Sequence, residues 1–73
     1  MLSWDDFRHI KAIADNGSPK GAAETLGVNQ AAALRRLDQI ERREDSRLFK
    51  RARSGYSLTS AGEDMLNLAT RAE

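Results

Sequence analysis

The chain has 73 residues and a mass of 8.1 kDa, which permits one domain near the lower size limit for a core stabilised by apolar packing alone. It contains no cysteine and a single histidine, which excludes disulfides and a zinc site made of thiolates and imidazoles. No apolar run approaches the roughly 18 residues of a membrane span, and the acidic start at Trp4-Asp5-Asp6 is unlike a signal peptide. We therefore expect a cytoplasmic protein.

Basic residues are concentrated in the middle of the chain. Residues 1–28 carry a net charge of −1, residues 29–53 a net charge of +4 and residues 54–73 a net charge of −2. A continuous positive segment is what contact with nucleic-acid phosphates requires. Charge alone would equally fit a solvated helix face, so the local residue patterns have to distinguish the two.

The first predicted helix begins after Ser3 and ends at residues 15–17. Ser3 can cap it, with Asp6 in the capping-box position, and Gly17 suits a left-handed helix end. Apolar side chains recur along one face at helical spacing, and we expect them in the core: Trp4, Phe7, Ile10 and Ala14, with Ile13 beside them. His9 is expected on the helix surface.

Two helices joined by a short turn follow. Ser18 and Pro19 are typical of the cap and first residue of a helix over residues 19–26, and Asn29 can cap a third helix over residues 30–44. Only residues 27–29 separate the two helices. A three-residue turn with a glycine between two amphipathic helices is the pattern of a helix-turn-helix, whose second helix enters the DNA major groove.

The second helix of this pair has two distinct faces. The core face carries Ala33, Leu37 and Ile40. The outward face carries Gln30, Ala31, Leu34, Arg35 and Asp38. Where the two helices cross, Ala23 is small enough for a close approach, and the angle between them is expected to be filled by Leu26, Val28 and Ala33.

A hairpin is predicted after Arg47. Two short strands over residues 48–51 and 56–58 are joined by residues 52–55, with Arg53 at the tip. Phe49 and Tyr56, one in each strand, are further candidates for the core.

A fourth helix is predicted after Thr59 or Ser60, either of which can cap it. Its narrow apolar stripe consists of Ala61, Met65, Leu68 and Ala72. The stripe could pack on the first helix, or its heptad-like spacing could suit a partner helix. We favour dimerisation, because a helix that projects beyond so small a core has little of its own domain to pack against. No helix-stop signal precedes Glu73, and we expect the helix to continue in a longer protein.

These elements together predict a mostly α-helical winged helix-turn-helix, with a three-helix core, a two-stranded wing and a C-terminal linker helix. Residues 1–58 would form the DNA-binding domain. Residues 59–73 would be the start of the linker or dimerisation helix.

Several segments resemble the N-terminal domain of LysR-type transcriptional regulators. In the helix-turn-helix, the matching segments are Gly17-Ser18, residues 22–30, Arg35-Arg36-Leu37 and Ile40-Glu41. In the wing and the helix after it, they are residues 47–51 and 58–62. The resemblance covers essentially the whole chain, in order and without gaps. It implies a dimeric, promoter-binding winged helix-turn-helix, normally followed by a small-molecule-sensing domain that is absent from this chain.

The sequence departs from the family pattern in the helix that would enter the groove. The family usually has serine at Asn29 and Leu34, proline or serine at Ala31, and a branched aliphatic residue at Ala33. Leu34 could meet a thymine methyl group, or it could turn inward to compensate for the small Ala33. Glu-Asp-Ser at residues 44–46 replaces the customary Leu-Gly-Val, which predicts a more acidic and less well anchored helix exit.

The predicted DNA contacts fall into two groups. Base-edge contacts are expected from Gln30, Ala31, Leu34 and Arg35. Contacts with phosphates and from the wing are expected from Ser18, Lys20, Asn29, Lys50, Arg51 and Arg53. Arg53 could enter the minor groove, whereas Arg51 could instead pair with Glu41 inside the domain.

The sequence thus predicts sequence-specific binding of double-stranded DNA for transcription regulation, with residues 30–44 in the major groove and residues 52–55 in the minor groove. The alternative is a protein-interaction module whose basic face binds an acidic partner and whose DNA affinity is vestigial. An enzyme is not expected, because no carboxylate pair, nucleophile–base set or phosphate-binding glycine loop can be assembled. No cofactor or metal is expected either.

Overall fold

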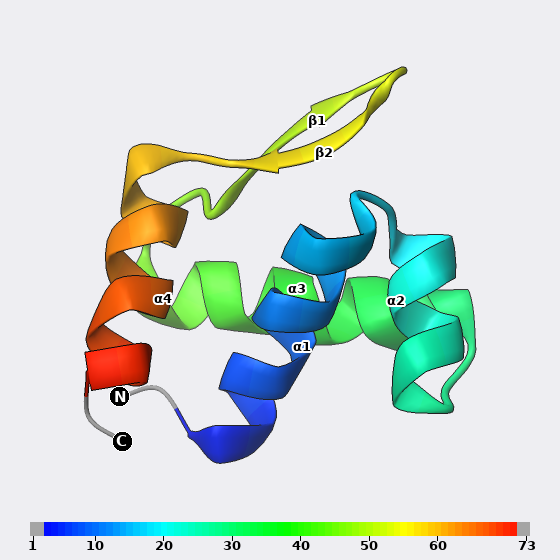
Figure 1. The fold of residues 1–73 in the computed structure, drawn as a ribbon, viewed down its shortest axis with the longest axis horizontal. Helices are drawn as coiled ribbons and strands as arrows, with labels where there is room; N and C mark the ends of the chain where they lie inside the picture. Colours follow the sequence, from blue (N-terminus) through cyan, green and yellow to red (C-terminus); the bar gives the residue numbers. More distant parts are fainter. Residues whose placement is uncertain (1–2, 72–73) are drawn as a thin grey trace.

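A computed structural model describes residues 3–71, with side chains through residue 68. Three helices come first, α1 (Trp4–Asn16), α2 (Pro19–Leu26) and α3 (Gln30–Glu44). An antiparallel hairpin of β1 (Phe49–Ala52) and β2 (Gly55–Leu58) follows, and then α4 (Ser60–Arg71). Figure 1 shows α1 crossing in front of α3, with α2 at one end of the molecule and α4 at the other. The mostly helical winged helix-turn-helix predicted from the sequence is confirmed.

The ends of the first helices are set by the predicted capping residues. Ser3 Oγ accepts the Asp6 N–H at 3.1 Å, and the Asp6 carboxylate accepts the Ser3 N–H at 3.2 Å, which completes the capping box. Gly17 and Gly27 end α1 and α2 in left-handed conformations with φ of 70° and 73°. Asn29 caps α3, as predicted, by accepting the Ala32 N–H at 2.7 Å.

The end of α3, for which the sequence predicts a more acidic and less well anchored exit, is closed by backbone hydrogen bonds. Asp45 adopts a left-handed φ of 52°, and the Ser46 N–H donates to the Glu41 carbonyl at 3.1 Å. Aspartate tolerates this conformation better than most residues other than glycine, because its short polar side chain can hydrogen-bond locally. The helix exit is therefore closed without the glycine that the family usually has.

The core lies between α1, α3 and the start of the hairpin. Its largest fully buried apolar members, each 0–2% exposed, are Ile10, Ile13, Leu37, Ile40, Leu48 and Phe49. Ala33 is completely buried and Ala23 is 5% exposed, as the close approach of α2 and α3 requires.

Three side chains lie elsewhere than predicted. Trp4 and Val28 are 64% and 39% exposed, and the Trp4 ring stacks on Phe7 at a centroid distance of 5.4 Å. His9 is only 7% exposed, with Nδ1 at 2.8 Å from the Asp5 carbonyl oxygen, so the Nδ1–H donates to that carbonyl. For Trp4 and His9 on α1, helical spacing identifies a face but does not tell where neighbouring elements end, so positions at its edge can fall on either side; Val28 lies in the turn between α2 and α3, where no helical spacing applies.

The hairpin is fixed on the turn between α1 and α2. Its strands pair from Phe49 opposite Leu58 to Ala52 opposite Gly55, one residue away from the predicted bounds at the start of each strand and at the end of β1. The Tyr56 N–H donates to the Gly17 carbonyl at 2.8 Å. At Gly55, where φ is 138°, a Cβ would lie 2.9 Å from the same carbonyl oxygen. Only glycine allows this close approach.

A buried carboxylate joins the hairpin to α3. Glu41 is 8% exposed, and its Oε2 accepts the N–H groups of Leu48 and Phe49 at 2.8 and 3.4 Å. Its Oε1 accepts from Arg51 Nη2 at 3.0 Å and lies 3.6 Å from Arg47 Nη1. One side chain of α3 therefore satisfies two backbone donors and two guanidinium groups at the start of the wing.

A second buried carboxylate joins α1 to α3. Asp6 is 1% exposed and accepts from Arg43 Nη2 at 2.6 Å and from Arg36 Nη1 at 3.4 Å. Arg36 Nη2 also lies 2.9 Å from Asp5 Oδ2. Burial raises the pKa of Asp6, but hydrogen bonds from Arg43 and Ser3 lower it by more, so that this pKa lies below its ordinary value.

α4 begins after Thr59, which settles the choice between the two predicted caps. Thr59 Oγ1 accepts the Gly62 N–H at 3.1 Å and donates to the Arg47 carbonyl at 2.6 Å. Ala61 and Met65 pack against the core together with Leu66, whereas Leu68 is 67% exposed. Ala72, the last member of the predicted stripe, lies outside the described residues. Within residues 3–71, no helix is long and apolar enough to cross a bilayer.

Removing the Glu41 carboxylate should destabilise the domain. Glu41→Ala leaves the Leu48 N–H without its acceptor and the partly buried Arg51 guanidinium without one of its two partners. We expect the free energy of unfolding to fall by about 2–4 kcal/mol, measured by urea denaturation with circular dichroism. Glu24→Ala, which removes an exposed carboxylate on α2, should change it by less than about 0.5 kcal/mol. Equal effects of the two substitutions would contradict the role of Glu41.

The Asp6 network should make stability depend on pH in the acid range. Because the pKa of Asp6 is lowered by folding, its contribution is complete above the ordinary value of 3.8 and is lost as the pH falls below it. Urea midpoints of the wild-type chain should therefore fall more steeply than those of Asp6→Asn between about pH 5 and pH 3. Asp15→Asn, which alters an exposed pair with Lys11, is the matched control and should follow the wild type. Parallel curves for wild type and Asp6→Asn would refute this assignment.

Candidate nucleic-acid interface

The start of α3, all of α2 and the tip of the hairpin lie toward one end of the molecule, on the right of Figure 1, and α4 stands at the opposite end. The longest axis of the molecule, 27 Å, separates these two ends. The start of the predicted groove-reading helix and the tip of the wing therefore lie toward one end of the fold, away from α4.

The first turns of α3 present a mixed polar and apolar face. Gln30, Ala31 and Arg35 are exposed, whereas Leu34 is half-buried. Arg35 has no ion-pair partner in the part of the chain that the structure describes. The face thus offers an amide, a guanidinium and two apolar groups on one rigid element.

Leu34 could either contact a thymine methyl group or turn into the core, and the structure shows its side chain as half-buried. The core slots of α3 are filled by Ala33, Leu37 and Ile40, each at most 1% exposed. Leu34 is not among the partly buried side chains that pack against the main core cluster. It therefore flanks the exposed face formed by Gln30, Ala31 and Arg35.

Both helix starts on this side have their caps in place. Ser18 Oγ accepts the Gly21 N–H at 3.1 Å, in the same way that Asn29 caps α3. These side-chain oxygens are already used within the domain. An anion could still bind to the remaining first-turn N–H groups of each helix and to the positive end of its dipole. Exposed Lys20 lies at the start of α2.

The wing carries both paired and unpaired basic residues. Lys50 and Arg53 are exposed and have no ion-pair partner among residues 3–71. Arg51 instead reaches back to α3, with Nη2 at 2.9 Å from Asp38 Oδ1 and at 3.0 Å from Glu41 Oε1. Its guanidinium carbon also lies 5.6 Å from the centroid of the Tyr56 ring. The internal Arg51–Glu41 pair, which the sequence left open, is present. Arg51 therefore joins β1 of the wing to α3.

Internal pairing decides which basic residues remain available to a ligand. In the segment with the highest positive charge, Arg36, Arg43, Arg47 and Arg51 have carboxylate partners within the domain. Among residues 3–68, whose side chains the structure describes, the basic residues without such a partner are Lys20, Arg35, Arg42, Lys50 and Arg53. Sequence reasoning did not single out Arg42, and it could not identify the pairs of Arg36 and Arg43, because their partners are about 30 residues away in the chain.

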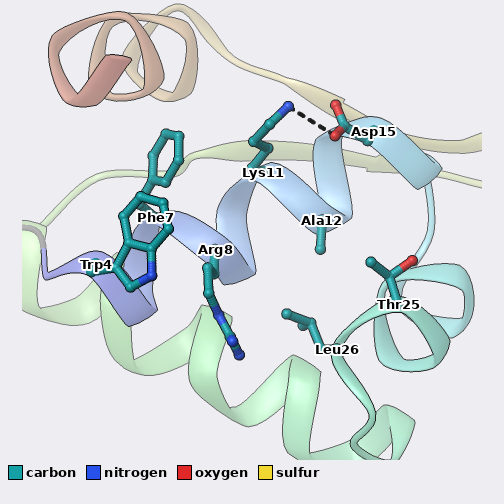
Figure 2. A pocket seen from close by; sticks show the side chains of 8 residues that line it. All are labelled: Trp4, Phe7, Arg8, Lys11, Ala12, Asp15, Thr25 and Leu26. Carbon is teal, nitrogen blue, oxygen red and sulfur yellow. Dashed lines mark hydrogen bonds and ion pairs between the residues drawn. The ribbon is translucent and has the colours of Figure 1, made fainter. Parts of the chain in front are cut away.

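A second surface feature is an open groove between α1 and the end of α2 (Figure 2). Its lining residues are Trp4, Phe7, Arg8, Lys11, Ala12, Asp15, Thr25 and Leu26. Lys11 Nζ pairs with Asp15 Oδ2 at 3.0 Å along one side of it. Nothing in the sequence pattern predicted this groove, since its walls come from two helices whose relative placement the sequence does not show. Across the residues that the structure describes, no cluster of three or more potential metal ligands exists here or elsewhere.

A family model described as "Bacterial regulatory helix-turn-helix protein, lysR family" matches residues 4–63. The chain is 39% identical over 66 residues to the HTH-type transcriptional regulator YofA of Bacillus velezensis, a match that covers 90% of this chain and 23% of YofA. It is 42% identical over 68 residues to the uncharacterized HTH-type transcriptional regulator YdcI of Escherichia coli, covering 89% of this chain and 22% of YdcI. The chain thus spans less than a quarter of the length of these curated relatives.

Solved structures show the same similarity. The fold matches that of a CbnR DBD in complex with DNA with a TM-score of 0.88 and 28% identity, over 97% of this chain and 82% of that one. It matches full-length CbnR complexed with its target DNA with a TM-score of 0.87 and 28% identity, over 97% of this chain and 25% of that one. Since the family model extends from the first helix into α4, the chain belongs to the LysR family of bacterial regulatory helix-turn-helix proteins, which are transcription regulators and not enzymes.

Proposed function

We propose that the chain is the DNA-binding domain of a transcription regulator and binds double-stranded DNA sequence-specifically. Residues 30–44 would lie in the major groove and residues 52–55 would reach the minor groove. The observation that carries this proposal is that the start of α3 and the tip of the hairpin lie toward the same end of the molecule (Figure 1), and that each element has an exposed arginine without an ion-pair partner among the described residues, Arg35 and Arg53. The similarity of the fold to the CbnR DBD in its DNA complex supports it.

The unpaired residues suggest a division of roles. Gln30, in the first turn of α3, has an amide that can pair bidentately with an adenine edge, and Arg35 can reach a guanine edge or a phosphate. Lys20 and the helix starts at Ser18 and Asn29 suit phosphates. Lys50 would contact the adjacent DNA backbone, and Arg53 would enter the minor groove.

We further propose that the complete protein acts as a dimer. Residues 1–58 would form the DNA-binding domain, and residues 59–73 would begin the helix that joins two copies. Leu68, 67% exposed on α4, supports this assignment, whereas Ala61 and Met65 are already packed on the domain's own core. A small-molecule effector would bind a domain outside this chain. Binding to bacterial DNA would place the protein in the cytoplasm.

The wing arginine should contribute affinity without sequence preference. Arg53→Ala should weaken binding to specific and random duplexes alike, and should make the slope of log K against log salt shallower by about 1 per domain. Fluorescence anisotropy with labelled duplexes at several salt concentrations measures both effects. Lys11→Ala removes a basic residue that is paired with Asp15 on α1, and it should leave the slope unchanged. An Arg53→Ala loss confined to one sequence would contradict the assigned role.

The α3 amide should contribute sequence preference. Gln30→Ala should cost about 1–3 kcal/mol on the preferred site and relax preference at one base pair. Selection of bound duplexes from random DNA, followed by mobility shifts, measures this; Asn67→Ala removes an exposed amide from α4 at the far end as the control.

A two-fold symmetric selected site would support the dimer, and a single asymmetric site would count against it. No shift at tens of micromolar protein in low salt would favour the protein-interaction module instead.

A further inference from the structure

The α3 surface that would face the groove contains an apolar patch between its two polar groups. Ala31 and Leu34 are three residues apart, so they are neighbours on one side of the helix. Ala31 is exposed and Leu34 is half-buried at the edge of the same face. Ala33 beside it is completely buried, as are Leu37 and, within 1%, Ile40. The core does not need Leu34 to fill those positions, and part of its side chain remains in solvent.

The chemistry of the major groove restricts what such a patch can meet. Base edges there present nitrogen and oxygen donors and acceptors, and the one apolar group that projects from them beyond a C–H bond is the methyl group on C5 of a pyrimidine. Leucine against a donor or acceptor would remove that atom from water without replacing its hydrogen bond, which is unfavourable. Leucine against a methyl group buries apolar surface on both sides.

We propose that Leu34, together with Ala31, recognises the 5-methyl group of a pyrimidine in the major groove. This inference rests on the proposed DNA-binding function. In duplex DNA the group belongs to thymine or to 5-methylcytosine, and the side chain would respond to the methyl group in either base. Leu34 lies four residues after Gln30, about 6 Å along the helix axis, and base pairs are about 3.4 Å apart. The methyl group should therefore lie within about two base pairs of the pair that Gln30 contacts.

Removing single methyl groups from DNA tests this directly. After a preferred duplex is selected from random DNA with this chain, each thymine in turn is replaced by deoxyuridine, which lacks only the methyl group. Loss of one buried methyl contact should weaken binding by wild-type protein about fourfold at one thymine. Replacing that thymine–adenine pair by cytosine–guanine, with and without the 5-methyl group on cytosine, shows whether 5-methylcytosine restores part of the affinity.

The Leu34→Ser variant separates recognition from packing. If Leu34 reads the methyl group, this variant should bind the thymine and deoxyuridine duplexes equally, whereas Lys11→Ala, which alters a paired lysine on α1, should retain the wild-type ratio. A role in packing alone would lower affinity for both duplexes by the same factor. Leu34→Ala serves as a second variant should the serine variant fail to fold, and the wild-type comparison needs no variant at all.

Each outcome bears on a defined claim. A thymine-to-deoxyuridine loss that disappears in Leu34→Ser supports the inference. A selected duplex at which no thymine near the Gln30 contact shows this loss, or at which Leu34→Ser keeps it, overturns the inference and leaves the proposed function intact. Failure to enrich any duplex overturns the proposed function and this inference with it.

Discussion

The orientation of the wing relative to α3 depends on one buried carboxylate. Glu41 accepts two backbone N–H groups at the start of β1 and holds Arg51 through its other oxygen. Arg51 in turn binds Asp38 one turn earlier on α3 and covers the Tyr56 ring in β2. A DNA-binding head of this size has few residues to spare for rigidity, and here Glu41 and Asp38 on α3 together hold Arg51, which connects α3 to both strands of the wing.

Local sequence signals predicted the helices well because each helix end is decided by nearby residues. Ser3 with Asp6, Ser18 with Pro19, and Asn29 act within three residues of their own position. The bounds of α2 and α3 accordingly agree with prediction residue by residue. The burial of His9 and the exposure of Trp4 were not predictable in this way, since they depend on how the other elements pack around α1.

The structure shows fewer unpaired basic residues at the candidate site than the composition of residues 29–53 indicates. Eight basic residues between 29 and 53 suggested a broadly positive face, yet Arg36 and Arg43 neutralise the buried Asp6 and its neighbour Asp5, and Arg51 neutralises Glu41. Arg36 and Arg43 are 30 and 37 positions away from Asp6 in the chain. Ion pairs over such separations produce no recognisable pattern in a sequence. The free charge is accordingly sparser and more localised than composition indicates, which favours a defined docking register over general adhesion to polyanions.

Gly62 has a consequence for any assembly built on this head. A Cβ at this position would lie 2.2 Å from the Leu48 carbonyl oxygen, so only glycine allows α4 to approach the residue before β1 this closely. The direction in which α4 leaves the domain is thus set by steric contact at one residue close to its first turn. If α4 joins two heads as proposed, a small tilt there is amplified along the helix into a change in the distance between them. The separation of operator half-sites that such a regulator accepts would then depend on a methylene-sized gap far from any base.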